Sequence, residues 1–301
     1  MSADEQNDGA GFAVERPRLV GLAYRMLGSL VDAEDVVQEA WLRWERADRS
    51  TIEHLPGWLT TVTSRLAIDR LRAQRRRRED YVGPWLPEPI VGPWVSADPT
   101  AGDPASAVVR NESLETGFLV VLDTLGPVER VVFVLADVFA VPYSQIADVV
   151  DRTPEACRQV ASRARRKVAE GRAGRRPADD GLLAELVGAI ASGRADAVIE
   201  LLAPGVVLTS DGGALRHAAR RPVVLPERVA RLLVNLGART TPEATLAIEQ
   251  VNGAAALVIR SGAGPVVLSA EREPVHGSIE RVHLMMNPDK LAALERRVEL
   301  S

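Results

Sequence analysis

The stretch from residue 80 to residue 111 cannot form a continuous helix, because it contains six prolines. Helical patterns precede this stretch and resume after it, so the chain must fold as separate helical modules joined by a connector. The connector also carries Tyr81, Trp85 and Leu86. A flexible spacer would need only polar residues and glycine, whereas prolines stiffen this one and its large side chains give it an apolar face. We therefore predict that the connector packs against another part of the protein.

The first helical module is predicted to span residues 12–79. One helix ends at Gly28, and Asp32 is the expected N-cap of a second, amphipathic helix. Its apolar face leaves an acidic side that needs a partner, formed by Asp35, Gln38 and Glu39. A third helix is expected to begin near Pro56. Its predicted apolar stripe consists of Leu59, Val62, Leu66 and Leu71.

The third predicted helix becomes steadily more basic along its length. From Arg65 to Arg78 it holds seven arginines and one acidic residue, Asp69. Such a run is often only a solubilising helix end or a nonspecific phosphate patch. Together with Trp44 and Trp58 it favours another function, since single-stranded DNA is held by a basic track and by aromatic pockets for unstacked bases.

A second helical module, predicted for residues 112–174, ends in a helix-turn-helix pattern. We expect Ser144 to cap its penultimate helix, Thr153 to cap the last, and Pro154 to be the first residue of that last helix. A recognition helix presents its N-terminal side chains to base edges in the major groove. A solvated amphipathic helix in an all-helical bundle is the alternative. The outward-facing residues are Arg158, Gln159, Ser162, Arg163 and Arg166.

Helical and strand patterns alternate after about Arg175, so residues 178–301 are predicted to form an α+β domain. A helical pair is followed by one strand, another helix, a hairpin around Gly262 and Gly264, and a last strand. The complete fold prediction is therefore a multi-domain chain with two all-α modules followed by an α+β domain.

Composition limits the function classes. The 301 residues carry a net charge of −4, which argues against a uniformly basic nucleic-acid coat. No basic-then-apolar leader and no apolar run near 18 residues is visible, so we predict a cytoplasmic protein without membrane contact.

The single cysteine, Cys157, excludes an internal disulfide and a cysteine-based zinc site, and we expect it to be a core residue. No cofactor or metal is predicted.

Three stretches, "AYRMLGSLVDAEDVVQEAWLRW", "PGWLTTVTSRLAIDRLR" and "SQIADVVDRTPEACRQVASRARRKV", resemble regions 2 and 4 of extracytoplasmic-function (ECF) RNA polymerase sigma factors of the sigma-70 family. The resemblance implies that Asp35, Gln38, Glu39 and Trp41 meet the clamp helices of the polymerase β′ subunit. It also implies two sets of promoter contacts. The −10 element is assigned to Trp58, Arg65, Arg70, Arg72, Arg75 and Arg76, and the −35 element to Thr153, Arg158, Gln159, Ser162, Arg163 and Arg166. Arg65 stands where such factors often have asparagine, so the −10 preference does not carry over.

The chain further resembles the subgroup with a SnoaL-like (NTF2-like) cone domain at its C-terminus. "WLPEP" spans residues 85–89 and "NPDKL" spans residues 287–291, whereas Ala214 and Leu215 replace the third glycine and the lysine of the subgroup's turn. In that subgroup the extension is thought to regulate the factor in place of a separate anti-sigma protein. The residues that this assigns to regulation are Trp85, Leu86, Pro87, Asp211, Gly212, Gly213, Asn287, Pro288, Asp289 and Lys290.

Two other functions remain open at this stage. A stand-alone helix-turn-helix regulator with a ligand-sensing tail would bind a palindromic site without polymerase. An enzyme in the cone domain would need an acid–base set. Its candidates by residue type are Asp211, His217, His276 and His283. We expect no catalysis, because an aspartate that begins a glycine turn and isolated histidines have ordinary structural roles.

Overall fold

The computed structural model describes residues 3–78, 81–91 and 114–296. The described residues form two compact units. The helical unit contains residues 3–78 and 121–171, and the sheet unit contains residues 81–91, 114–120 and 172–296. Across these described ranges, no helix has the length and apolar character needed to cross a membrane.

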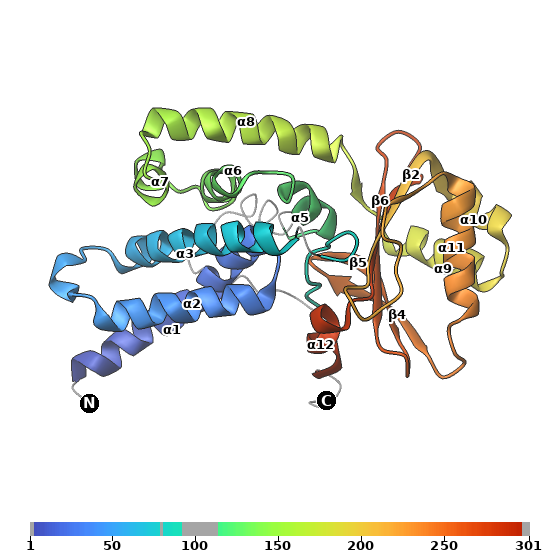
Figure 1. The fold of residues 1–301 in the computed structure, drawn as a ribbon, viewed down its shortest axis with the longest axis horizontal. Helices are drawn as coiled ribbons and strands as arrows, with labels where there is room; N and C mark the ends of the chain where they lie inside the picture. The colour runs from blue at the N-terminus through green and yellow to red at the C-terminus, as the bar shows by residue number, and fades with distance from the viewer. Residues whose placement is uncertain (1–2, 79–80, 92–113, 297–301) are drawn as a thin grey trace. The chain divides into compact units, whose positions relative to one another are not determined.

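The first part of the helical unit consists of three long helices and a short 3₁₀ turn (Figure 1). The prediction that Asp32 caps the second helix is wrong. Ser29 is the N-cap, and its hydroxyl accepts a hydrogen bond from the Asp32 backbone N–H. The Asp32 carboxylate instead receives the side chains of Arg70 and Gln74 from the third helix. The elements are α1 (Ala3–Leu27), α2 (Leu30–Arg46), η1 (Arg49–Thr51) and α3 (Leu55–Arg78).

The buried side of α3 differs from the predicted stripe. Leu59 and Leu71 are buried as expected, but Val62 and Leu66 are only half-buried. The pattern assumed one partner surface, whereas α3 packs against α1 and α2 and also against α6 and α7. Positions between the two surfaces are therefore enclosed, and they are Thr63, Ser64, Ala67 and Ile68.

The second part of the helical unit ends in the predicted helix-turn-helix. Ser144 is not a cap; Pro142 occupies that position, and its carbonyl accepts the backbone N–H groups of Gln145 and Ile146. Thr153 does cap the last helix, since its hydroxyl accepts the Ala156 N–H at 3.2 Å. The elements are α5 (Thr116–Leu122, which begins in the sheet unit), α6 (Pro127–Phe133), the π-helical η2 (Val134–Val138), α7 (Tyr143–Val150) and α8 (Pro154–Arg172).

The sheet unit contains one mixed sheet with the order β3-β2-β7-β6-β5-β4, and β1 pairs with β6. Strands β2 and β7 are parallel, and the other pairs are antiparallel. The α+β class is confirmed, but β1, β3, β4 and α12 were not predicted. The elements are β1 (Arg176–Pro177), α9 (Asp180–Ala191), α10 (Ala195–Leu201), β2 (Leu202–Asp211), β3 (Val223–Val224), α11 (Pro226–Ala238), β4 (Thr245–Val251), β5 (Ala254–Arg260), β6 (Val266–Arg272), β7 (Ile279–Met285) and α12 (Pro288–Arg296).

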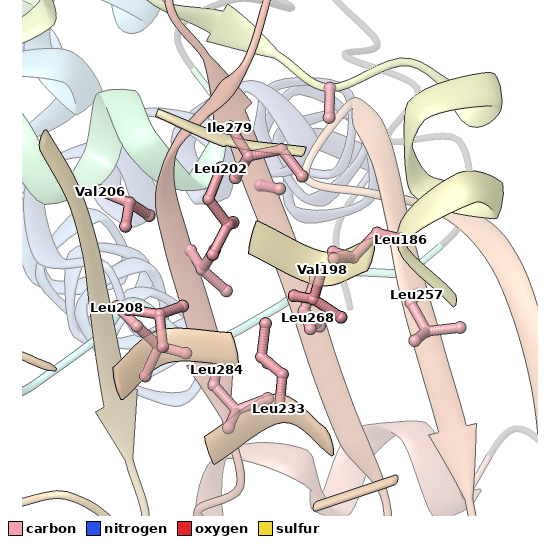
Figure 2. Close-up of a cluster of buried hydrophobic side chains, with 14 of the residues drawn as sticks. Leu186, Val198, Leu202, Val206, Leu208, Leu233, Leu257, Leu268, Ile279 and Leu284 are labelled. Atoms are coloured by element: carbon pink, nitrogen blue, oxygen red, sulfur yellow. The ribbon is translucent and has the colours of Figure 1, made fainter. Parts of the chain in front are cut away.

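The two faces of this sheet have different coverings. On the inner face, α9, α10 and α11 enclose a leucine- and valine-rich core, in which Leu233 of α11 lies near Leu284 of β7 (Figure 2). The outer face carries a second cluster that includes Leu86 of the connector and Leu291 of α12. Because side chains alternate along a strand, His283 of β7 points to the outer face while Leu284 points inward.

Candidate polymerase and promoter interfaces and the linker contact

The exposed side of α2 carries the residues predicted to meet polymerase. Asp35 and Gln38 are exposed, and Glu39 pairs with Arg43 at 3.0 Å. Trp41 is half-buried and lies on Phe12, with ring centroids 4.7 Å apart. Asp35, Gln38 and Trp41 border a groove of about 500 Å³ between α1 and α2. The assignment of this side to polymerase binding stays a prediction; Asp35 and Gln38 are exposed there.

The arginines of α3 are largely bonded within the helical unit. Arg70 donates to Asp32 and to Asp35, the latter at 3.1 Å. A residue predicted to meet DNA and one predicted to meet polymerase are thus paired with each other. Arg65 donates to the carbonyl of Asp148 at 2.6 Å, and Arg72 pairs with Asp69 at 3.2 Å.

The ends of α3 hold the other predicted −10 residues. Trp58 is half-buried in the first turns and packs on Trp44, with ring centroids 5.7 Å apart. Arg75 is exposed and reaches the Leu125 carbonyl at 3.4 Å, and Arg76 is exposed. The side chains of residues 77 and 78 lie outside the described set.

Two fully buried arginines join the two halves of the helical unit. Arg130 of α6 donates to the backbone carbonyl of Arg25 at 3.2 Å and pairs with Asp123 at 2.9 Å. Arg25 donates to the Gly21 carbonyl and lies over the Phe139 ring. Sequence reasoning missed both, because hydrophobic patterns treat arginine as a surface residue. A lone basic residue inside an otherwise apolar stripe is the signal that marks such positions.

The predicted outer face of α8 is exposed throughout its length. Cys157 and Val160 are buried on the opposite side, where burial raises the pKa of the Cys157 thiol. Arg158 pairs with Glu155 at 3.1 Å and lies over the Tyr143 ring. No hydrogen bond or ion pair joins Gln159 or Arg166 to any residue that the structure describes. The exposed face consists of Arg158, Gln159, Ser162, Arg163 and Arg166.

In the sheet unit, the carboxylate of Asp211 at the end of β2 gathers the connector and α12. It is fully buried, and it accepts hydrogen bonds from the Tyr81 hydroxyl at 2.6 Å and from the Leu86 backbone N–H at 2.9 Å. Lys290 of α12 contacts the same carboxylate at 2.7 Å and donates to the Leu86 carbonyl at 2.6 Å. A buried charge is stable only when it is paired in this way.

Aromatic side chains of the connector enclose this ion pair. The Lys290 ammonium lies 4.1 Å from the centroid of the Trp85 ring. Burial and the hydrogen bond to Asp211 raise the pKa of the Tyr81 hydroxyl, so it stays a donor. Asn287 donates to that hydroxyl at 2.9 Å and accepts the Asp289 N–H, which starts α12.

The glycines of the turn after β2 permit this close packing. A Cβ at Gly212 would lie 2.5 Å from the Arg216 carbonyl oxygen. Gly213 has φ of +59°, and its N–H donates to Asp211 at 3.1 Å. Leu215 stands where the subgroup's turn has lysine, and the cation that contacts Asp211 in this chain is Lys290 of α12.

Farther along the connector, Asn252 in the β4–β5 turn binds two segments. Its side-chain oxygen accepts the Ile90 N–H at 2.8 Å, and its backbone N–H donates to the Ile90 carbonyl at 2.8 Å. Its amide nitrogen donates to the Thr116 hydroxyl at 3.3 Å. Asn252 thus contacts the segment that follows the first helical module and the segment that begins the second. No sequence signal pointed to it.

The four residues considered for acid–base chemistry do not share a cavity. Asp211 and His283 lie on the outer face, where His283 contacts Glu271 at 3.3 Å. His276 is exposed in the β6–β7 turn, and His217 lies beside α11. Among the described residues, no group of three or more His, Cys, Asp and Glu side chains is placed to hold a metal ion.

Comparison with known proteins gives the class first. Residues 12–77 match the sigma-70 region 2 family and residues 118–168 match the sigma-70 region 4 family. The ECF RNA polymerase sigma factor SigJ of Mycobacterium tuberculosis is 43% identical over 77% of this chain and 73% of its own length. A probable ECF sigma factor of the same species, SigI, is 36% identical over 97% of this chain and 96% of its own length.

A solved structure agrees with these relatives. The crystal structure of M. tuberculosis SigJ aligns with a TM-score of 0.72 at 35% identity, covering 94% of this chain and 98% of that one. The chain therefore belongs to the ECF RNA polymerase sigma factors of the sigma-70 family. As such, it binds core RNA polymerase and promoter DNA and acts in transcription initiation.

Proposed function

We propose that the sheet unit inhibits this sigma factor by holding Ile90 of the connector and Thr116, at the start of the second helical module, on the same residue. The observation that carries the proposal is the contact of Asn252 with both Ile90 and Thr116. The first helical module ends before Ile90, and the second continues from Thr116. While both contacts persist, the two modules cannot move far apart.

Promoter recognition requires them to move apart. Elements centred at −10 and −35 differ by 25 positions, which is about 85 Å along duplex DNA at roughly 3.4 Å per base pair. In the helical unit the modules touch, through Arg65 and Asp148 and through Arg130 and Arg25. One molecule therefore has to open before it contacts both elements.

The Asp211 cluster adds to the restraint. Its buried carboxylate depends on Tyr81 and Leu86 of the connector as well as on Lys290, so lifting the connector would leave a buried charge partly unpaired. Breaking one partner of a buried ion pair typically costs about 3–5 kcal/mol. Because Tyr81 and Leu86 bind the same carboxylate, the connector is expected to detach from the sheet as one segment.

The residue assignments made from the sequence are part of the same proposal. The exposed acidic side of α2, with Asp35, Gln38, Glu39 and Trp41, is the surface for the β′ clamp helices. Residues on α3 open and read the −10 element after Arg65 and Arg70 leave their partners. The exposed face of α8 reads the −35 element in duplex form.

We infer that the sheet unit acts as a regulatory domain and not as an enzyme. Asp211 and His283, two of the four acid–base candidates by residue type, lie in separate bonded networks on the covered face of the sheet. Because the protein works on polymerase and chromosomal DNA, we infer that it acts in the cytoplasm.

Replacement of Asn252 by glycine tests the inhibition directly. Asn252 has φ of +52°, which glycine adopts freely, so Asn252→Gly removes two side-chain hydrogen bonds and preserves the turn. These bonds contribute roughly 1–3 kcal/mol together. We expect promoter-specific transcript from core polymerase and the full-length variant to rise several-fold over the wild type.

Gln250→Ala is the matched control, because Gln250 is exposed on the neighbouring strand β4. It should leave transcript levels unchanged. Equal output from Asn252→Gly and the wild type, with both proteins folded, would show that the clamp does not limit initiation.

A further inference from the structure

An open groove runs along α11 on the inner side of the sheet unit. It lies between α11, the ends of β2 and β7, and residues 217–219, and its volume is about 550 Å³. Small-molecule sites typically have volumes of about 300–1,000 Å³. This groove is separate from the Asp211 and Asn252 contacts, which lie on the outer face.

The charge of the groove has one sign. Arg228 and Arg231 lie one turn apart on α11, Arg239 caps the same helix, and His217 lines the groove from the turn after β2. All four side chains are exposed, and none forms an ion pair with a residue that the structure describes. The described lining residues include no aspartate or glutamate. Guanidinium groups bind carboxylate and phosphate with paired hydrogen bonds.

Apart from Ser210 and Asn235, the rest of the lining is apolar. Leu232 and Leu236 line it from α11, and Leu284 and Met286 line it from the end of β7. Ser210 is already bonded to the backbone of Ala219, so its hydroxyl does not compete for a ligand. A phosphate backbone would cover the arginines but leave the half-buried Leu232 and Leu236 uncovered. A small molecule with an anionic group and a hydrocarbon body would cover both.

We propose that this groove binds a small amphipathic anion, with its carboxylate or phosphate on Arg228, Arg231 and Arg239 and its hydrocarbon part on Leu232, Leu236 and Met286. The proposal concerns binding, so it does not depend on the inhibition by Asn252. It gives the sheet unit a ligand class.

Calorimetric titration of the full chain with sodium decanoate, below its critical micelle concentration, tests the proposal. We expect saturable binding at one site. Decanol, which lacks the charge, and inorganic phosphate, which lacks the apolar body, should each bind at least about tenfold more weakly, since each loses one half of the contacts. Failure of decanoate to bind, or equal binding by decanol or phosphate, would overturn the proposal.

Two substitutions test whether decanoate binds in this groove. Arg231→Gln should weaken decanoate binding by roughly tenfold, and Asn235→Asp should do the same by adding a negative charge on the same side of α11. Both positions are exposed, so thermal unfolding should not change. Arg221→Gln is the control, because Arg221 is exposed in the same unit and does not line the groove. If Arg231→Gln weakens duplex DNA binding and leaves decanoate binding intact, the arginines serve nucleic acid and the proposal is wrong.

Discussion

The basic helices α3 and α8 look alike in the sequence but differ in how their arginines are engaged. On α3, Arg65 and Arg70 are bonded to a carbonyl of α7 and to carboxylates of α2. On α8, ion pairs lie along the flank, while Gln159 and Arg166 have no partner among the described residues. If both surfaces bind DNA as proposed, the α8 surface can do so as it stands, whereas Arg65 and Arg70 of α3 must first exchange partners.

This difference assigns an order to promoter binding. Under the proposed function, we expect duplex recognition by α8 to need no change in the helical unit, and strand opening by α3 to require the two modules to separate. A charged run therefore does not by itself identify an available nucleic-acid surface; the partners of each arginine decide that.

The largest expected effect concerns the joint between the modules. Arg130→Ala leaves the Arg25 carbonyl and Asp123 without their buried partner. We expect the free energy of unfolding to fall by about 3 kcal/mol, which urea denaturation of the full chain measures. Lys167→Met removes a surface pair with Glu129 and should cost less than about 1 kcal/mol. If both variants lost a similar free energy of unfolding, Arg130 would not be the main link between the two modules.

An intermediate effect is expected on duplex binding. Gln159→Ala should weaken binding of the full chain to a −35 duplex by about 1–3 kcal/mol and leave binding to a scrambled duplex unchanged, because base contacts carry the specificity. Fluorescence anisotropy at fixed salt measures both.

The α3 helix supplies the control for that experiment. Arg70→Ala should leave affinity for the −35 duplex within error, since Arg70 is paired with Asp32 and Asp35. A loss as large as that of Gln159→Ala would erase the distinction between the two helices.

The smallest expected effect is on the pH dependence of stability. It concerns Glu129 of α6, which pairs with Lys167 of α8. Hydrogen bonds from Lys167 and from the Gly126 N–H lower the pKa of Glu129 below its ordinary value of 4.5. Stability from this carboxylate is therefore present above about pH 4.5 and is lost as the pH falls through the lowered pKa. In Glu129→Gln, the fall in melting temperature at acidic pH should be slightly smaller. An unchanged pH profile would mean that the pair contributes nothing measurable.

Local chemistry made much of the fold predictable. Thr153 and Pro154 mark the start of α8 because a cap and a first-turn proline act within a few residues. The same rule failed at Asp32 and Ser144, where another acceptor, Ser29 or the Pro142 carbonyl, stood closer to the helix start. Family motifs also pointed to the residues that meet at Asp211.

The missed features depend on contacts between distant residues. The buried guanidinium of Arg130 donates to the carbonyl of Arg25, 105 residues away, and Arg25 lies over the ring of Phe139. The side chain of Asn252 joins two segments only in the folded protein, where Ile90 and Thr116 lie beside it. A lone arginine in an apolar stripe can mark a buried position but does not identify its distant partner, and Asn252 has no local signal, so propensity and periodicity cannot reveal these contacts.

The position of Lys290 near the end of the sequence delays the ion pair with Asp211 during synthesis. The helix-turn-helix is complete at Arg172, and the ammonium group that neutralises Asp211 follows 118 residues later. At about 5–20 residues per second, translation of that interval takes roughly 6–24 s. Each newly made molecule thus contains both sigma-70 regions before the ion pair between Lys290 and Asp211 can form. Under the proposed inhibition, we expect its access to polymerase in that period to depend on translation speed.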